Sequence, residues 1–191
     1  VLTLVTQLSH AAFKLPHYEH FALANGLQVF LMPQHEVPMI DVRLTIRAGA
    51  IHDQQQAGLA NLTSQSLMFG SGKLSKAEVE DKLAFHGAQL SSSTSTEMSN
   101  LALSLAAKDQ QQLLKLFRDV ALKPQFNAQE FAKYKKRFIN QLNQQRESPR
   151  NVISTVFNKM YYGEHPYGNS TLGTPDSVDN LALKNIKKLN C

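Results

Sequence analysis

The chain has 191 residues, of which 42% are hydrophobic and 18% are charged, and its formal net charge is +5. These proportions are typical of a globular domain and exclude a disordered or fibrous protein. The only cysteine is the last residue, which excludes an internal disulfide and any site built from several cysteines. The chain contains no run of about 18 apolar residues, so no membrane span is predicted. The net positive charge is too small to indicate a particular partner.

Residues 1–12 are largely apolar and contain no Lys, Arg, Asp or Glu. Ser9-His10-Ala11 has the small residues typical of a signal-peptide cleavage site, but the positively charged start of such a segment is missing. The β-branched residues of this stretch suit a β-strand equally well. We therefore expect residues 1–16 to be a signal-peptide remnant or an N-terminal strand, followed by a single domain over residues 17–191. The signal-peptide interpretation predicts a periplasmic or secreted protein.

Three strand-like runs come next, over residues 21–23, 27–33 and 39–48. Asn25-Gly26 separates the first two runs, and this pair is typical of a tight β-hairpin turn. From Ile40 to Ile46, apolar and polar residues alternate, which predicts a strand with one buried face.

The rest of the chain is predicted to be mostly helical, with one further hairpin. Ser75 and Glu78 form a capping box that starts one helix, and Asn127 with Glu130 forms a variant of it at the start of another. Two hairpins separated by helices predict an α+β fold, with an antiparallel sheet covered by helices on one face. The expected elements are helices over 58–69 and 76–86, strands over 88–94 and 98–105, helices over 109–122, 128–147 and 151–162, and a turn-rich segment over 163–175.

Six short segments carry sequence motifs. They are Leu23–Val29, Arg47–Ala50, Gly58–Gly70, Gly87–Ser92, Tyr161–Gly168 and Leu172–Pro175. In this order they resemble the motifs of the M16 family of zinc peptidases, which includes insulinase, pitrilysin and the mitochondrial processing peptidase. The resemblance covers residues 18–189 and implies an M16-like (LuxS/MPP-like) domain, an antiparallel sheet packed with helices. This agrees with the fold class predicted from the residues alone.

The segment Gly58–Gly70 resembles the zinc-binding helix of that family, whose pattern is G-x-A-H-x-x-E-H-x-L-x-x-G. Here Asn61 replaces the first His, Ser64 the Glu and Gln65 the second His. The third ligand of the family, a Glu on a later helix, matches Gln141. Helix residues three and four apart share a face, so the family pattern brings two imidazoles to one metal. Zinc prefers thiolate, imidazole or carboxylate ligands, so the resemblance implies that this domain has no metal, no cofactor and no catalytic residue of its own.

Enzymes of this family consist of two halves of like fold that close around a peptide, and only one half carries zinc. The resemblance implies that this chain is the first domain of a catalytically silent half or subunit. Its expected partners are a homologous zinc-bearing subunit or half, forming a heterodimer, and an extended peptide substrate in proteolysis. In the family, the strand matching residues 88–94 is the sheet edge on which the peptide lies. Gln89, Ser91 and Ser93 are predicted to line that edge.

Two other functions stay open. One is an active zinc metallopeptidase with displaced ligands such as His17, His20 or His86, and the other is a stand-alone peptide-binding or scaffold domain. His52-Asp53 lacks a third ligand, and we expect this pair at the surface. The lysines and arginines of the helix over 128–147 are interpreted as a solvated face, so no nucleic-acid partner is expected.

Overall fold

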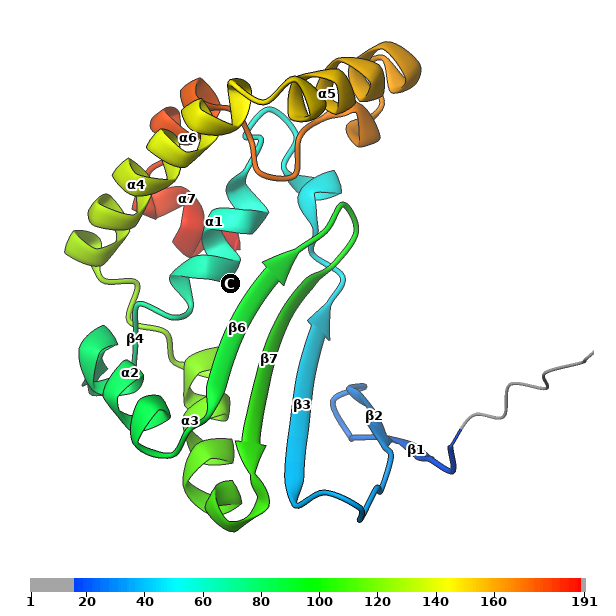
Figure 1. Cartoon of the computed structure of the whole chain (residues 1–191), viewed down its shortest axis with the longest axis vertical. Helices are drawn as coiled ribbons and strands as arrows, with labels where there is room; N and C mark the ends of the chain where they lie inside the picture. The colour runs from blue at the N-terminus through cyan, green and yellow to red at the C-terminus, as the bar shows by residue number, and fades with distance from the viewer. Residues whose placement is uncertain (1–15, 190–191) are drawn as a thin grey trace, which may run out of the picture. The chain divides into compact units, whose positions relative to one another are not determined.

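The computed structural model describes residues 16–189 (Figure 1). The chain forms two compact units, which are divided between Pro38 and Met39. Apart from Pro16, the predicted signal-peptide remnant or strand over residues 1–16 lies outside the described residues, and the single domain over 17–191 stays a prediction. Within the described part of the chain, no helix is both long enough and apolar enough to cross a bilayer.

The first unit contains a two-stranded hairpin, as predicted. β1 (Glu19–Ala22) pairs antiparallel with β2 (Gln28–Leu31). In the turn between them Gly26 has φ +84°, and the Asn25 side chain accepts a hydrogen bond from the Leu27 N–H at 3.1 Å. Asn-Gly turns form because Gly adopts positive φ without steric cost and Asn bonds its own backbone.

The second unit is built on a three-stranded antiparallel sheet. Its strands are β3 (Met39–Ile46), β7 (Ser99–Ala106) and β6 (Gln89–Thr94), in the spatial order β3-β7-β6. The pairing of β6 with β7 confirms the second predicted hairpin. β6 is therefore an end strand of this sheet, and one side of its backbone has no strand partner in it.

The two faces of the sheet differ in burial, in agreement with the predicted alternation. Leu101, Leu103 and Leu105 of β7 are buried, whereas Asp41 and Arg43 of β3 are exposed on the opposite face. The buried face lies against helices, so the predicted α+β architecture is confirmed.

Three helices cover the buried face (Figure 1). They are α1 (Leu59–Ser66), α2 (Lys76–Phe85) and α3 (Gln110–Leu122). Each contributes a side chain to one core with Leu103: Leu62 from α1, Val79 from α2 and Val120 from α3. The predicted capping box of α2 is formed, with Ser75 and Glu78 bonding each other's backbone.

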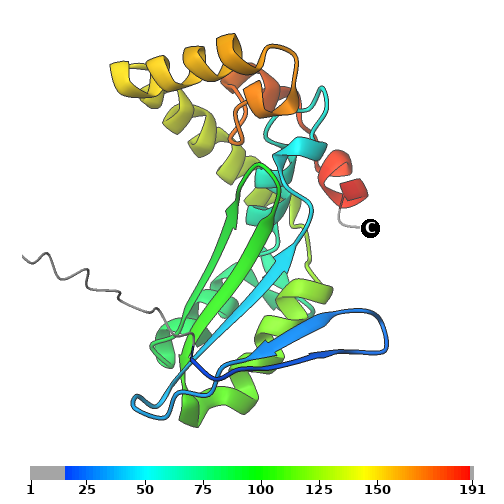
Figure 2. The same cartoon turned by 90° about the vertical axis from the view of Figure 1, so that its right-hand side faces the viewer.

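The second half of this unit consists of helices. The Asn127 side chain caps α4 (Ala128–Arg146) by accepting hydrogen bonds from the N–H groups of Gln129 and Glu130. Lys135 Nζ on α4 donates to the Leu181 carbonyl at 3.1 Å, which joins α4 to the segment between the last two helices. Figure 2 shows the helices of this half near one end of the sheet. The last two helices were not predicted. The elements are α4 (Ala128–Arg146), α5 (Pro149–Tyr162), α6 (Pro175–Asn180) and α7 (Leu183–Leu189), with 3-10 helices at Ala50–His52, Ala107–Asp109 and Pro166–Gly168.

Among the predicted boundaries, the end of α1 differs most from the structure. The helix expected to reach residue 69 ends at Ser66, and Gly70 instead starts a short strand. There β4 (Gly70–Ser71) pairs with β5 (Leu74–Ser75). Gly70 has φ +123°, a backbone conformation that no helix contains.

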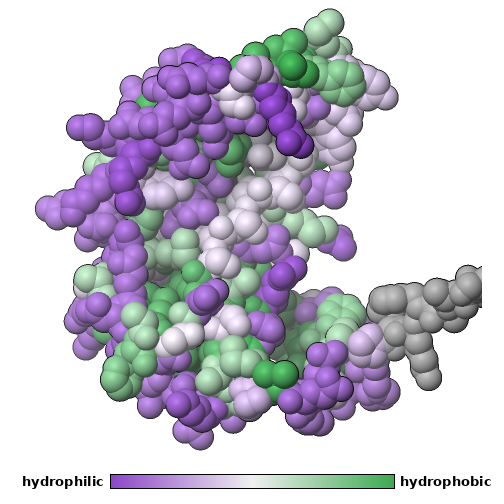
Figure 3. All heavy atoms as spheres, viewed as in Figure 1, coloured by the Kyte–Doolittle hydropathy of each residue, from purple (hydrophilic) through white to green (hydrophobic). Residues whose placement is uncertain are grey.

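α5 presents an exposed apolar face. Figure 3 shows hydrophobic atoms gathered at the end of the unit that α5 forms in Figure 1. Such surfaces on soluble domains commonly mark contacts with further polypeptide. The exposed apolar side chains of this helix are Val152, Ile153, Val156, Phe157, Met160, Tyr161 and Tyr162.

Candidate functional site

The candidate site lies on α1, whose first turn is held by a buried carboxylate. Asp53 is only 5% exposed. Its two oxygens accept hydrogen bonds from the N–H groups of Gly58 and Ala60, both at 2.8 Å. These are N–H groups for which the helix itself has no acceptor. The surface position predicted for Asp53 is therefore wrong.

Burial raises the pKa of Asp53, while the hydrogen bonds from Ala60 and Gly58 oppose this rise. Because the protonated form of Asp53 is favoured in the folded state, its titration contributes to the free energy of unfolding. This contribution is complete below pH 3.8, the pKa of the carboxyl group in the unfolded chain. It declines as pH rises through the raised folded value.

We expect Asp53→Ala to lower the free energy of unfolding by about 2–4 kcal/mol, because two buried N–H groups lose their acceptor. Urea titration measures this. The matched variant Asp53→Asn keeps one acceptor and should cost about 1–2 kcal/mol near pH 7. The gap between Asp53→Asn and the natural protein should be wider near pH 4 than near pH 7. A gap that widens toward pH 7 would contradict the raised pKa.

Two of the replaced positions on α1 are hydrogen-bonded to the edge strand. The Ser64 hydroxyl is joined by a hydrogen bond to the hydroxyl of Ser92 on β6. Gln65 Nε2 donates to the Ser92 carbonyl oxygen at 3.0 Å. Where the family pattern has a catalytic Glu and a zinc-binding His, this chain thus has polar contacts that fasten α1 to β6.

Ser92 was not among the predicted site residues. A signal for it existed, because the alternation of the run from Gln89 to Thr94 puts Ser92 on the same face as Leu90, toward the helices. Its partner could not be inferred from spacing, since Ser64 and Ser92 are 28 residues apart.

Asn61 is buried, and its Nδ2 has no hydrogen-bond partner among the described residues. An amide N–H left without a partner in the interior costs about 1–3 kcal/mol. Asn61 therefore contributes little to the stability of α1, in contrast to Ser64 and Gln65.

Gln141 lies on α4, where it is exposed, while its neighbour Leu142 is buried. Within residues 16–189 no hydrogen bond joins its side chain to α1. The structure brings Ser64 and Gln65 together with Ser92, but it does not join Gln141 to them by a contact. The assignment of Gln141 as the third replaced ligand stays a prediction.

These side chains do not fit a zinc ion. Three amides and a hydroxyl stand at the four positions, and zinc prefers thiolate, imidazole or carboxylate ligands. Among the described residues, no three His, Cys, Asp or Glu side chains are grouped so that they could hold a metal.

The three histidines considered as displaced zinc ligands, His17, His20 and His86, either contact other side chains or are exposed, with no further zinc-binding side chains of the described residues grouped around them. His20 Nε2 is hydrogen-bonded to Gln28 Oε1 at 2.8 Å, and its ring stacks on Phe30. His86 Nδ1 lies 3.0 Å from the Asp109 carboxylate. His17 is exposed before β1. The described residues therefore offer no observation in favour of displaced zinc ligands.

The pairing of β6 with β7 decides which backbone groups point to the free edge. Ser95 N–H donates to the Met98 carbonyl at 2.8 Å, so Ser95 points toward β7. In an antiparallel pair, alternate residues point the same way. Gln89, Ser91 and Ser93 thus bond β7, whereas Leu90, Ser92 and Thr94 direct their N–H and C=O groups to the free edge.

This assignment agrees with the Gln65 contact, because the Ser92 carbonyl that Gln65 reaches must point away from β7. The side chains of Gln89, Ser91 and Ser93, predicted to meet a peptide, are exposed on the face that carries Asp41 and Arg43. Their contact with a peptide stays a prediction. The backbone donors that an added strand would use belong to the residues between them.

Comparisons with known proteins identify the family. The family model described as insulinase, peptidase family M16, matches residues 29–175. The chain is 26% identical over 185 residues to the zinc protease PqqE of Helicobacter pylori, covering 95% of this chain and 41% of that protein. It is 24% identical over 155 residues to the non-peptidase homolog YmxG of the same organism, covering 81% of this chain and 36% of that protein.

Solved structures show the same fold. The inactive domain of an M16 peptidase from Pseudomonas fluorescens superposes with a TM-score of 0.87 at 26% identity, covering 91% of this chain and 43% of that chain. A protease from Helicobacter pylori superposes with a TM-score of 0.85 at 23% identity, covering 92% and 43%. This chain spans about two fifths of the length of these relatives. Since the family model matches most of its residues, the chain belongs to the insulinase family of peptidases, M16.

Proposed function

We propose that this chain is part of the metal-free, substrate-holding half of a two-part M16 peptidase, and that peptide hydrolysis takes place on a zinc-bearing partner. The observation that carries the proposal is the chemistry of α1. The helix and sheet are kept, but Ser64 and Gln65 bond the edge strand instead of offering ligands and a general base. A serine hydroxyl near neutral pH is a far weaker base for a water molecule than a carboxylate.

The relatives support a division of roles. One organism, Helicobacter pylori, has both a zinc protease and a non-peptidase homolog that match this chain. The relatives are also more than twice as long as the matched region, so more polypeptide is expected around this unit. The exposed apolar face of α5 suits a contact with such polypeptide.

The free edge of β6 supports the substrate-holding role. An extended peptide can add to a sheet edge by main-chain hydrogen bonds, which require no particular side chain and no metal. The outward groups of Leu90, Ser92 and Thr94 offer such bonds, and the exposed side chains of Ser91 and Ser93 lie beside them. A strand that pairs with Ser92 would share its carbonyl oxygen with the Gln65 amide or replace that amide there.

The test is to mix the full-length protein with the zinc-bearing M16 protein of the same organism and follow cleavage of a quenched fluorescent peptide. Activity should rise about tenfold or more above the sum of the two proteins alone, a difference of at least about 1.4 kcal/mol in transition-state stabilisation. A zinc-bearing protein whose catalytic Glu is changed to Gln is the control, and its mixture should stay inactive. If the zinc-bearing protein is fully active alone and light scattering shows no association, a stand-alone peptide-binding domain becomes the better account.

The same assay tests the edge. Ser92→Pro should weaken peptide binding by the pair, because Pro removes the outward N–H. Ser92→Ala keeps that N–H and is the matched control. Ser91→Pro is unsuitable, because the N–H it removes points to β7 and its loss weakens the sheet itself. Equal binding by Ser92→Pro and Ser92→Ala would contradict strand addition at this edge.

A further inference from the structure

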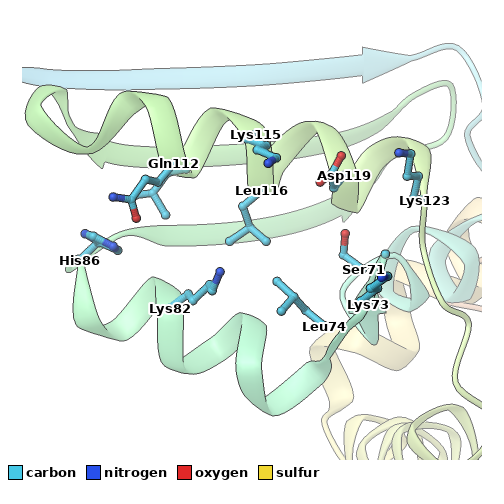
Figure 4. Close-up of a pocket in the computed structure, with 12 residues that line it drawn as sticks. Ser71, Lys73, Leu74, Lys82, His86, Gln112, Lys115, Leu116, Asp119 and Lys123 are labelled. Atoms are coloured by element: carbon cyan, nitrogen blue, oxygen red, sulfur yellow. The ribbon is translucent and has the colours of Figure 1, made fainter.

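A second candidate site lies between α2 and α3. A groove of about 480 Å³ opens there, and none of its lining residues belongs to α1 (Figure 4). One wall comes from α2, the other from α3, and one end from the turn that joins β4 to β5. The groove is therefore separate from the positions that the family uses for metal.

The groove is lined by four lysines and a single carboxylate. Lys82 comes from α2, Lys115 from α3, Lys123 from the end of α3 and Lys73 from the β4–β5 turn. Within residues 16–189, no carboxylate lies within 4.0 Å of any of these four ammonium groups. The pKa of Glu78 is lowered mainly by its hydrogen bonds with Ser75, and Lys82 adds only a smaller effect. Like charges that gather without close counterions attract anions.

The one carboxylate in the lining already has a partner. Asp119 accepts a hydrogen bond from Arg118 at 2.8 Å, and this bond, with smaller effects of Lys123 and Lys115, lowers the pKa of Asp119. Asp119 is therefore ionised near neutral pH, but part of its charge is offset by Arg118. The lining keeps an excess of positive charge.

A buried hydroxyl at one end of the groove lacks a partner. Ser71 is 2% exposed, and its Oγ makes no hydrogen bond to any described residue. Figure 4 shows this hydroxyl directed into the groove, with Lys73 beside it and Lys123 at the same end. A buried hydroxyl without a hydrogen-bond partner is uncommon in folded proteins, and a ligand or an ordered water commonly forms the missing hydrogen bond.

Apart from Gly72, His86 and Gln112, the rest of the lining is apolar, and the groove is extended rather than built around one point. Leu74, Leu113 and Leu116 lie between the lysines. The turn lacks the free donor of a phosphate loop, because Gly72 N–H donates to the Lys123 carbonyl at 2.8 Å. Dispersed ammonium groups over an apolar base suit a ligand with several separated anions and apolar groups between them.

We propose that this groove binds an extended acidic segment of polypeptide. Its carboxylates pair with the four lysines, one of them reaches the Ser71 hydroxyl, and its apolar side chains lie on Leu74 and Leu116. The site is independent of the role proposed for α1 and β6, and its test does not depend on peptidase activity.

The probe is a fluorescent, end-blocked peptide of alternating Glu and Leu residues, and its binding to the protein is followed by anisotropy. The double variant Lys82→Glu/Lys115→Glu should lower the affinity about tenfold or more, because it removes two attractive charges and adds two repulsive ones. Lys136→Glu/Lys184→Glu makes the same change of net charge at exposed lysines outside the groove and should lower it less than about threefold. Ser71→Ala should weaken binding about twofold to fivefold without a change of net charge.

Equal losses of affinity in the two double variants would show that the peptide is bound only by general charge attraction and would overturn the proposal. Absence of binding by the natural protein would also overturn it. So would displacement of the labelled peptide by pyrophosphate at a lower concentration than unlabelled peptide requires, since a compact anion would then be the better ligand. Unchanged affinity in Ser71→Ala would overturn the placement of a carboxylate at Ser71. Thermal melting confirms that each variant is folded.

Discussion

The fourfold variant Asn61→His, Ser64→Glu, Gln65→His and Gln141→Glu should bind one zinc ion per chain, whereas the natural chain should bind none. Positions 61 and 65 are one helical turn apart on α1, so the two imidazoles would share a face. Zinc sites with three protein ligands of this kind hold the ion with dissociation constants of about 1 μM or tighter, which corresponds to a binding free energy of at least about 8 kcal/mol in magnitude.

Metal analysis after incubation with zinc and gel filtration measures this prediction. The variant also replaces the buried Ser64, so it should be less stable than the natural protein without zinc and should melt at a higher temperature once zinc is added. The threefold variant without Gln141→Glu is the matched control and should bind zinc at least about tenfold more weakly. Equal affinities would show that Gln141 is not the third position. One zinc per natural chain, bound near α1, would refute the metal-free assignment.

Gly49→Ala should lower the free energy of unfolding by about 3–5 kcal/mol, the largest stability effect that we expect from a single added methyl group. A Cβ on Gly49 would lie 2.4 Å from the carbonyl carbon of Glu97 and 2.4 Å from the Met98 nitrogen. Both are backbone atoms of the turn between β6 and β7, so no side chain can move aside. The turn must shift, which strains the bond from Gly49 N–H to the Glu97 carbonyl at 3.1 Å.

Gly87→Ala is the matched control, since Gly87 has φ +61° but open space around its Cβ position. It should cost only about 1–2 kcal/mol, from the left-handed backbone. Gly49 has φ −93°, which any residue adopts, so its effect is steric alone. Urea titrations of the two variants would separate the two causes. A smaller loss for Gly49→Ala than for Gly87→Ala would contradict the close packing of this turn.

Local interactions made much of the fold predictable. The Asn25-Gly26 turn, the capping box of Ser75 and Glu78 and the cap at Asn127 depend on residues at most four apart, and all three are formed. The alternation of β3 and β7 predicted which residues face the core, except that Ile46 at the end of β3 is exposed. The end of α1 was missed, because the backbone of Gly70 is set by its close approach to Leu74 and Gln125. The capping box at Thr174 and Ser177 is a local sequence signal for the start of α6.

The family and the loss of ligand chemistry at Asn61, Ser64 and Gln65 could be inferred from the sequence alone, because a motif depends on residue types at fixed spacing along the chain. What those side chains do instead depends on how the helices pack on the sheet. Ser64 and Gln65 reach Ser92, and the four lysines of the groove come together from α2, α3 and the β4–β5 turn. These residues are far apart in the chain, and only the packing of helices on the sheet brings Ser64 and Gln65 within hydrogen-bonding distance of Ser92 and gathers the four lysines in one groove.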